Sequence, residues 1–231
     1  MSLLFLKFSN LVSGYGDTMV LRDVSGSVER GSVLGVLGRN GVGKTTLMKT
    51  LAGYIKPQGG TVTLNGRNVN ALAPQDRLHA GMAYAPQENV VFGDLSVHEN
   101  LWLHLDDKDE SRYESCLKSF PRLVERMAQR SGLLSGGERK LLSFTRSMGL
   151  RSPLTILDEP TEGVQPENIH RMATLVRSQC ATGAAFVIVE QNLEFLLSVA
   201  DTVLVMDHGQ VMLDSRVEST SREKLEEFLM V

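Results

Sequence analysis

A glycine-rich stretch that ends in a lysine and two threonines carries the clearest chemistry in this sequence. It reads Gly38-Arg39-Asn40-Gly41-Val42-Gly43-Lys44-Thr45-Thr46 and matches the spacing G-x-x-x-x-G-K-[ST]. Glycines let several backbone N–H groups approach one anion, Lys44 can reach the β- and γ-phosphate oxygens, and the Thr45 hydroxyl can hold Mg²⁺. An apolar run before the stretch predicts a strand, and the run after it predicts a helix. The stretch therefore predicts a loop that binds a nucleoside triphosphate.

Two adjacent carboxylates end another apolar run, at residues 154–158. Neighbouring residues of a strand point to opposite faces, so Asp158 and Glu159 cannot share one task. We assign Asp158 to the metal ion and Glu159 to the general base that prepares the attacking water. Acids at a strand end are solvated loop residues in many proteins, but a phosphate-binding loop in the same parallel sheet favours the catalytic interpretation.

Three weaker signals have two interpretations each. Tyr15, on a glycine turn, could be a packing residue or a platform for adenine. Gln87 follows a short strand, so it could be a surface amide or lie at the sheet edge where ligands bind. Ser135-Gly136-Gly137 opens a helix and could be an ordinary helix start or a second anion-binding nest.

Composition limits the class of protein. The 231 residues are 42% hydrophobic and 22% charged, enough for a sizeable core, and the net charge of −3 argues against a general nucleic-acid surface. Cys116 and Cys180 fit no metal or disulfide pattern, so we expect both to be structural residues of a reducing compartment. No apolar run approaches the length of a membrane span, and the first residues do not resemble a leader peptide. We expect a soluble protein.

The strand and helix signals alternate at both ends of the chain, whereas helical periodicity dominates the middle. Residues 3–8 predict an edge strand, and 111–127 predict one helix or two divided at Pro121. We expect a single domain with these parts: a nucleotide-binding core in 1–88 and 151–218, an inserted helical subdomain in 89–150, and a C-terminal helix in 219–231.

Taken in order, the motifs resemble the ATP-binding subunit of ABC transporters over almost the whole chain. The phosphate loop matches at 38–46, the family's glutamine loop at Gln87, its signature motif at 134–138 and its second acidic motif at 154–160. Tyr15 falls where the family's adenine-stacking aromatic lies. The resemblance implies an α/β fold: a P-loop core with a mainly parallel sheet, an N-terminal antiparallel β subdomain and an inserted helical subdomain.

The resemblance also implies a head-to-tail dimer, of identical or related subunits, with two ATP molecules at its interface. Each ATP would lie between one subunit's phosphate loop and the other subunit's Ser135-Gly136-Gly137. The implied roles are catalytic for Lys44, Gln87, Glu159 and Gln191, and metal-binding for Thr45, Gln87 and Asp158.

Three residues depart from the family pattern. Glu138 stands where the signature usually has Gln, and Gln165 replaces an Asp that communicates across the dimer. Gln191 replaces the switch histidine, and it can donate a hydrogen bond but cannot carry a proton. Because Glu159 is kept, we expect reduced or altered ATP hydrolysis, not its loss.

The sequence Val-Glu-Gln-Asn at 189–192 resembles importers of urea and of branched-chain amino acids, and the phosphate loop at 38–46 together with Glu159–Pro166 resembles the urea type most. The resemblance implies a peripheral subunit on the cytoplasmic face of the inner membrane. Its partners would be two membrane permease subunits, a second ATPase subunit and, indirectly, a periplasmic solute-binding protein, with no nucleic acid.

A groove near Gln87 is expected to accept a short permease helix, with Val90-Val91-Phe92 either lining it or packing in the core. The alternatives are a branched-chain amino acid importer, a soluble ABC ATPase of translation or DNA repair, and a weakly hydrolysing regulatory subunit.

Overall fold

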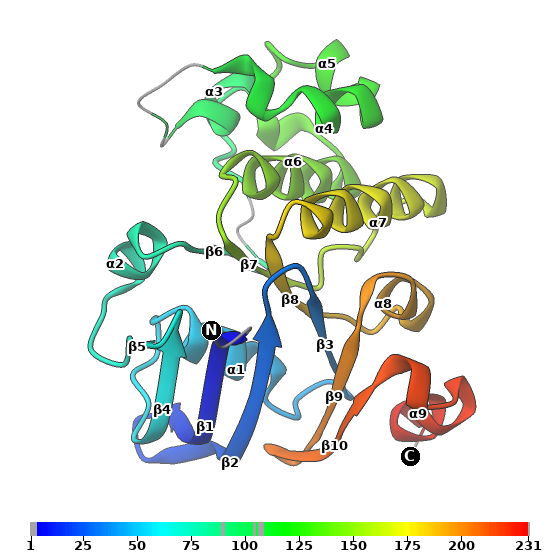
Figure 1. Cartoon of the computed structure of the whole chain (residues 1–231). Coiled ribbons are helices and arrows are strands. Elements are labelled where there is room, and N and C mark those ends of the chain that lie inside the picture. The colour runs from blue at the N-terminus through cyan, green and yellow to red at the C-terminus, as the bar shows by residue number, and fades with distance from the viewer. Residues whose placement is uncertain (1–3, 89–90, 104, 106–108, 231) are drawn as a thin grey trace.

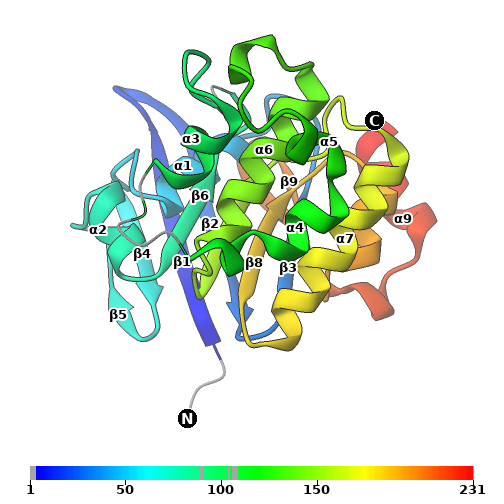
Figure 2. The ribbon, with the colours of Figure 1, turned by 90° about the horizontal axis from the view of Figure 1, so that it is seen from above.

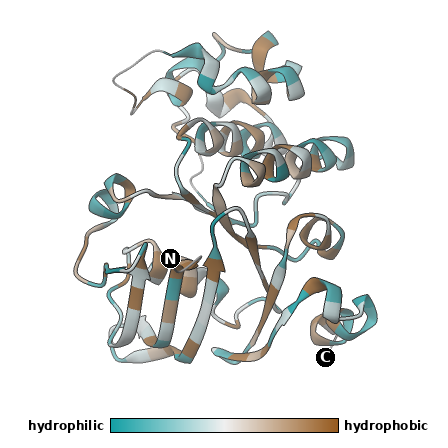
Figure 3. Cartoon of the chain, viewed as in Figure 1, coloured by the Kyte–Doolittle hydropathy of each residue, from teal (hydrophilic) through white to brown (hydrophobic). Residues whose placement is uncertain are grey.

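A six-stranded, mainly parallel sheet forms the centre of the molecule (Figure 1). The computed structural model describes residues 4–88, 91–103, 105 and 109–230. The strand order is β10-β9-β3-β8-β7-β6, and only β10 is antiparallel to its neighbour. The bounds are β3 (Val33–Leu37), β6 (Met82–Ala85), β7 (Leu154–Asp158), β8 (Ala185–Val189), β9 (Thr202–Asp207) and β10 (Gln210–Arg216). Every residue of β3, β7 and β8 is buried, as expected for parallel strands covered on both faces, and Figure 3 shows apolar colours along this sheet.

A second, antiparallel sheet has the order β2-β1-β4-β5. Its strands are β1 (Leu4–Tyr15), β2 (Thr18–Glu29), β4 (Gly59–Leu64) and β5 (Arg67–Asn68). The prediction of an edge strand at 3–8 is wrong, because β1 lies between β2 and β4, with Phe8 opposite both Gly26 and Val62. The two sheets confirm the predicted α/β class, with its mainly parallel core and antiparallel N-terminal sheet.

The two faces of the parallel sheet face different apolar cores. On β3, Leu34 and Val36 join a core that α1 (Lys44–Leu51) shares with both sheets. Val33 and Leu37 point to the opposite core, which includes side chains of α6 (Gly136–Gly149), α7 (Pro166–Ala181) and α8 (Leu193–Val199). This alternation fixes β3, and the loop that follows it, between two packed layers.

Arg77, on α2 (Pro74–His79), ties the far end of α1 to the rest of the core. Its side chain is buried and donates to the carbonyl oxygens of Thr50 (2.9 Å) and Leu51 in the last turn of α1, and to that of Leu72 (3.2 Å). Burial lowers the pKa of the guanidinium to about 10. No ion pair joins Arg77 to an acid in the described part of the chain. Backbone carbonyl oxygens, mainly those in the last turn of α1, therefore accept the hydrogen bonds of its guanidinium.

The middle of the chain is helical. The stretch between β6 and β7 contains α3 (Val97–Trp102), α4 (Glu114–Ser119), α5 (Pro121–Glu125) and α6. The structure divides the predicted helix 111–127 at Pro121, after a 3-10 turn at Glu110–Arg112, since proline removes an N–H donor and restricts the residue before it. Helix α4 contacts both α6 and α7, and Figure 2 shows these three side by side.

The chain ends in α9 (Arg222–Met230). Helix α9 lies beside β9 and β10 in Figure 1, and its Leu225 is buried in the same core as α8. None of the described helices is both long and apolar enough to cross a bilayer.

Candidate functional site

The phosphate loop lies between β3 and α1, and its shape depends on glycine. Gly43, the N-cap of α1, has φ 106°, and Gly38 has φ 151°, both in the region that favours glycine. A Cβ on Gly38 would lie 2.4 Å from the carbonyl oxygen of Met206, so no larger residue fits there. Around Gly41 the space is open. The loop therefore presents a bare backbone ahead of a helix N-terminus, the geometry that binds phosphate.

Lys44 holds the loop closed on itself. Its Nζ donates to the carbonyl oxygens of Gly38 (2.7 Å) and Arg39 (2.8 Å). Burial lowers the pKa of this ammonium group, while the charges of Glu159, Asp158 and then Glu190 act in the opposite direction. The ammonium group is thus fixed inside the loop, where an incoming phosphate would meet it.

Two of the predicted residues, Gln87 and Gln191, donate to the Glu159 carboxylate. Gln87 Nε2 donates to Oε2 (2.8 Å), and Gln191 Nε2 donates to Oε1 (2.8 Å). The same nitrogen of Gln191 also donates to Oδ1 of Asn40 in the phosphate loop (2.9 Å). Glu159 itself has φ 48°, a strained value for a residue with a side chain, and its N–H donates to the carbonyl oxygen of Val189 (2.9 Å). The strain and the two amides together fix the direction of the carboxylate.

Asp158 fits a cation. Its Oδ2 accepts a hydrogen bond from the Tyr84 hydroxyl (3.3 Å), and the side chain of Thr45 lies close enough to stabilise the charged carboxylate. Burial raises the pKa of Asp158, and the Tyr84 hydroxyl and the Thr45 side chain oppose that rise. Its Oδ1 is buried and has no hydrogen-bond partner among the described residues. An unpartnered carboxylate oxygen beside a threonine hydroxyl suits Mg²⁺, which takes one or two carboxylates and completes its shell with water and substrate phosphates.

The signature segment is a capped helix start. Ser135 Oγ accepts from the N–H of Glu138 (3.2 Å), and Glu138 Oε2 accepts from the N–H of Ser135 (2.9 Å). Glu138, in place of the family's Gln, also pairs with Arg126 (3.3 Å). A Cβ on Gly136 would meet open space. In the part of the chain that the structure describes, no hydrogen bond joins the signature segment to the phosphate loop.

Lys140 was missed from the sequence, although it lies in the signature helix. Its Nζ donates to the backbone oxygens of Gln87 (2.9 Å) and Glu159 (3.0 Å), and it pairs with Glu162 (3.3 Å). It thus joins α6 to the two loops that carry Gln87 and Glu159. A cation two residues after the signature could have signalled such a contact.

Two other predicted residues lie at the margins. Tyr15 ends β1 with its side chain 51% exposed, so its adenine-stacking role stays a prediction. Gln165 is the N-cap residue of α7, where its side chain makes no capping hydrogen bond.

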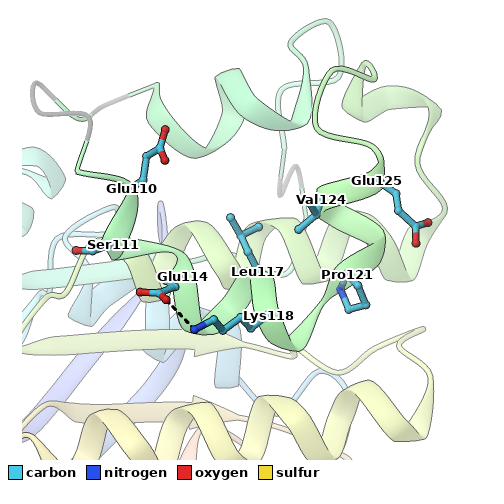
Figure 4. Close-up of a pocket in the computed structure, with 8 residues that line it drawn as sticks. All are labelled: Glu110, Ser111, Glu114, Leu117, Lys118, Pro121, Val124 and Glu125. Atoms are coloured by element: carbon cyan, nitrogen blue, oxygen red, sulfur yellow. Dashed lines mark hydrogen bonds and ion pairs between the residues drawn. The ribbon is translucent and has the colours of Figure 1, made fainter.

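Three hollows surround these elements. A cavity of about 990 Å³ borders the phosphate loop, with Gln191 and the α9 residues Phe228 and Leu229 in its wall. A cavity of about 580 Å³ lies between the core and α6, lined by residues that include Tyr54, Phe92, Leu103 and Arg146. A third, of about 790 Å³, lies on α4 and α5, where Leu117, Pro121 and Val124 face one another (Figure 4). This third cavity contains none of the predicted site residues.

The expected contribution of Val90-Val91-Phe92 is divided between core and surface. Val90 lies outside the described residues. Val91 packs against the core, whereas Phe92 is 55% exposed, with the guanidinium of Arg146 5.8 Å from its ring centroid. Of the two described residues, only Phe92 therefore offers apolar surface to a partner.

A glycine loop between a parallel strand and a helix, with its lysine and an acidic pair at the end of another strand of that sheet, defines a P-loop nucleotide-binding protein. Comparison with known proteins narrows this class. The ABC transporter family model matches residues 21–162. The chain belongs to the ABC transporter family, as an ATP-binding subunit that hydrolyses ATP, which confirms the resemblance seen in the sequence.

Individual relatives agree with this assignment. The chain is 32% identical to the high-affinity branched-chain amino acid transport ATP-binding protein BraG of Pseudomonas aeruginosa, over 90% of this chain and 91% of that protein. It is also 32% identical to the probable branched-chain amino acid transport ATP-binding protein LivF of Archaeoglobus fulgidus, over 97% and 98%. A lipopolysaccharide export ATP-binding protein, LptB of Acidithiobacillus ferridurans, is 30% identical over 90% of this chain and 88% of that protein.

A solved structure supports the fold. The ATP-binding subunit of an ABC transporter superposes with a TM-score of 0.86 at 26% identity, over 96% of this chain and 98% of that one.

Proposed function

We propose that this chain is the ATPase subunit of an importer of branched-chain amino acids. The observation that carries the solute class is the 32% identity to two proteins named for that transport, over at least 90% of the chain and of each relative. This favours branched-chain amino acids over urea, whose importers the phosphate loop at 38–46 together with 159–166 resembled most. Urea and an exported lipid remain as outcomes of the test below.

The chemistry starts with the placement of the triphosphate. The backbone of 38–46 and the ammonium group of Lys44 would exchange their present internal hydrogen bonds for the β- and γ-phosphate oxygens. Thr45, Asp158 and the side-chain oxygen of Gln87 would hold Mg²⁺. When bound, Mg²⁺ neutralises charge that develops on the phosphate oxygens.

Glu159 would orient and deprotonate the attacking water. Its carboxylate is linked through Gln191 to the phosphate loop, and in the described part of the chain its oxygens accept hydrogen bonds from side-chain amides and not from backbone N–H groups. Gln87 and Gln191 each donate to one of its oxygens, so both amides can set its direction. Gln191 links that carboxylate to Asn40 of the phosphate loop, because its amide nitrogen has two hydrogens to donate. A neutral histidine has a single N–H and could donate to only one of these two acceptors. Because Gln191 carries no charge, we expect slower turnover than a protonatable residue would support.

Within the described residues no hydrogen bond joins Ser135–Gly137 to the phosphate loop, which supports a two-chain site. The open space around Gly136 leaves the helix N-terminus accessible to a phosphate from another subunit. We propose that ATP joins two subunits head to tail, with Tyr15 stacked on adenine, and that hydrolysis separates them.

The cavity between the core and α6 would receive a short permease helix, which places the chain on the cytoplasmic face of the membrane. The exposed rings of Tyr54 and Phe92 and the apolar Leu103 suit an amphipathic helix. Arg146, at the Phe92 ring, adds a positive charge to this wall.

A tagged copy of the chain, purified from detergent-solubilised membranes of its source cells, tests the proposal. We expect two multi-spanning proteins and a second ATPase subunit to copurify, and the complex in vesicles to take up leucine but not urea. Uptake of urea alone would replace the solute, and recovery with ribosomal, repair or lipid-export proteins would refute the importer.

The docking face has its own test, with a matched control. Phe92→Asp should abolish copurification with the permease, whereas Met212→Asp, on β10 and with the same 55% exposure, should not. Equal recovery with both variants would remove Phe92 from the interface.

A further inference from the structure

A buried carboxylate precedes Gln191, which donates to Glu159. Glu190, the residue between β8 and Gln191, is only 3% exposed. Its Oε1 accepts the N–H of Thr161 (2.8 Å), in the loop after β7. Its Oε2 accepts the N–H groups of Gln191 (3.1 Å) and Asn192 (3.2 Å), in the loop after β8. One side chain therefore holds two loops, each through a different oxygen.

We infer that Glu190 is a positioning residue that fixes the loops on both sides of the Glu159 carboxylate. The inference rests on the proposed role of Glu159. Gln191 belongs to one loop and donates to Glu159, while Glu159 and Thr161 belong to the other. Fixing the two loops to one group sets the angle at which the Gln191 amide meets the Glu159 carboxylate.

Only a carboxylate can do this. An amide of the same shape has one accepting end and one donating end, so a glutamine at 190 would turn N–H groups toward each other in one of the two loops. Within the described residues, all three hydrogen bonds of Glu190 have a backbone N–H as donor and a carboxylate oxygen as acceptor. These bonds oppose the rise in its pKa that burial produces.

The loop held through Thr161 extends the effect to the signature helix. Val164 N–H donates to the Thr161 carbonyl oxygen (3.0 Å), which closes a turn around Gly163. A Cβ on Gly137 would lie 2.5 Å from the Gly163 oxygen, so that turn packs against the first turn of α6. Glu190 thus connects the ATP site of its own chain to the helix start proposed to serve the partner's ATP.

Glu190→Gln tests the inference, because it changes neither size nor shape. We expect kcat for ATP hydrolysis to fall about tenfold, equivalent to a rise of about 1.4 kcal/mol in the activation free energy. The KM for ATP should not rise, and the affinity for a fluorescent ATP analogue should not fall. The phosphate loop is untouched, and the loss of a negative charge near Lys44 does not oppose ATP. Glu194→Gln, an exposed acid in the first turn of α8, is the control and should keep wild-type turnover.

A shorter acid separates positioning from charge. Glu190→Asp keeps the negative charge but withdraws the oxygens by one methylene, so it can no longer reach both loops. We expect its kcat to fall as well. Wild-type turnover by Glu190→Asp would overturn the inference, and this variant decides the question if Glu190→Gln does not fold.

A double variant shows whether Glu190 acts through Gln191. Turnover of Glu190→Gln/Gln191→Ala should lie within about threefold of the slower single variant, because both disturb one contact to Glu159. Multiplication of the two effects would contradict the inference. Full turnover by Glu159→Gln would instead refute the proposed base, whatever the Glu190 variants do.

Discussion

Gln191 offers the most direct test of the site, because one nitrogen serves two acceptors. Gln191→Ala removes the donor to Glu159 Oε1 (2.8 Å) and the donor to Asn40 Oδ1 (2.9 Å). A hydrogen bond to a charged group contributes about 1.5–3 kcal/mol, and the exposure of Gln191 places this one at the lower end. Gln87 still holds the other oxygen of Glu159 (2.8 Å), so orientation is weakened but kept.

We therefore expect the activation free energy of hydrolysis to rise by about 1–2 kcal/mol, a roughly 5- to 30-fold fall in kcat. The assay is steady-state phosphate release by the purified subunit at saturating Mg²⁺-ATP. Asn40→Ala removes only the second acceptor and should reduce kcat less. Turnover within twofold of wild type for Gln191→Ala would show that this contact does not direct the carboxylate proposed as the base.

Three other changes test the rest of the site. Glu159→Gln should reduce turnover about 10²- to 10⁴-fold and leave ATP affinity intact, as phosphate-release and equilibrium-binding measurements would show; unimpaired turnover would exclude it as the base. Tyr15→Ala should weaken ATP binding roughly 5- to 30-fold, from about 1–2 kcal/mol of lost stacking, and leave binding of inorganic triphosphate unchanged. Tyr54→Ala, also an exposed ring, is its control, and equal ATP affinity of the two variants would contradict stacking. Arg77→Met should lower the free energy of unfolding by about 1–3 kcal/mol, because it leaves the buried carbonyl oxygen of Leu51 without its donor and leaves Thr50 with only the N–H of Gly53, and urea unfolding should show the loss.

The sequence is sufficient for the parts of the site that are local. The phosphate loop is one stretch of nine residues between a strand and a helix, and its chemistry follows from residue type and spacing. The roles of Asp158 and Glu159 were predicted in the same way, from residue type and position in the chain. Gln87 and Gln191 needed the family resemblance, since their common contact with Glu159 joins residues that are far apart in the chain.

The features that the sequence did not predict depend on pairings between distant segments. Nothing near residues 4–15 shows that β4 will pair with the far side of β1, so an interior strand resembled an edge. Glu190 accepts from Thr161, 29 positions earlier, and Lys140 donates to the backbone of Gln87, 53 positions earlier. Backbone partners have no residue type to recognise, so such contacts become visible only in the folded chain.

Arg77 has a consequence for how ATP binding begins. An isolated helix as short as α1 is unstable in water, yet its N-terminus must present an ordered phosphate loop. The arginine fixes the last turn of α1 during folding, so the helix is already formed when the nucleotide arrives. Preorganisation of this kind removes an entropic penalty from binding, and affinity for ATP then depends in part on a side chain at the opposite end of α1 from the phosphates.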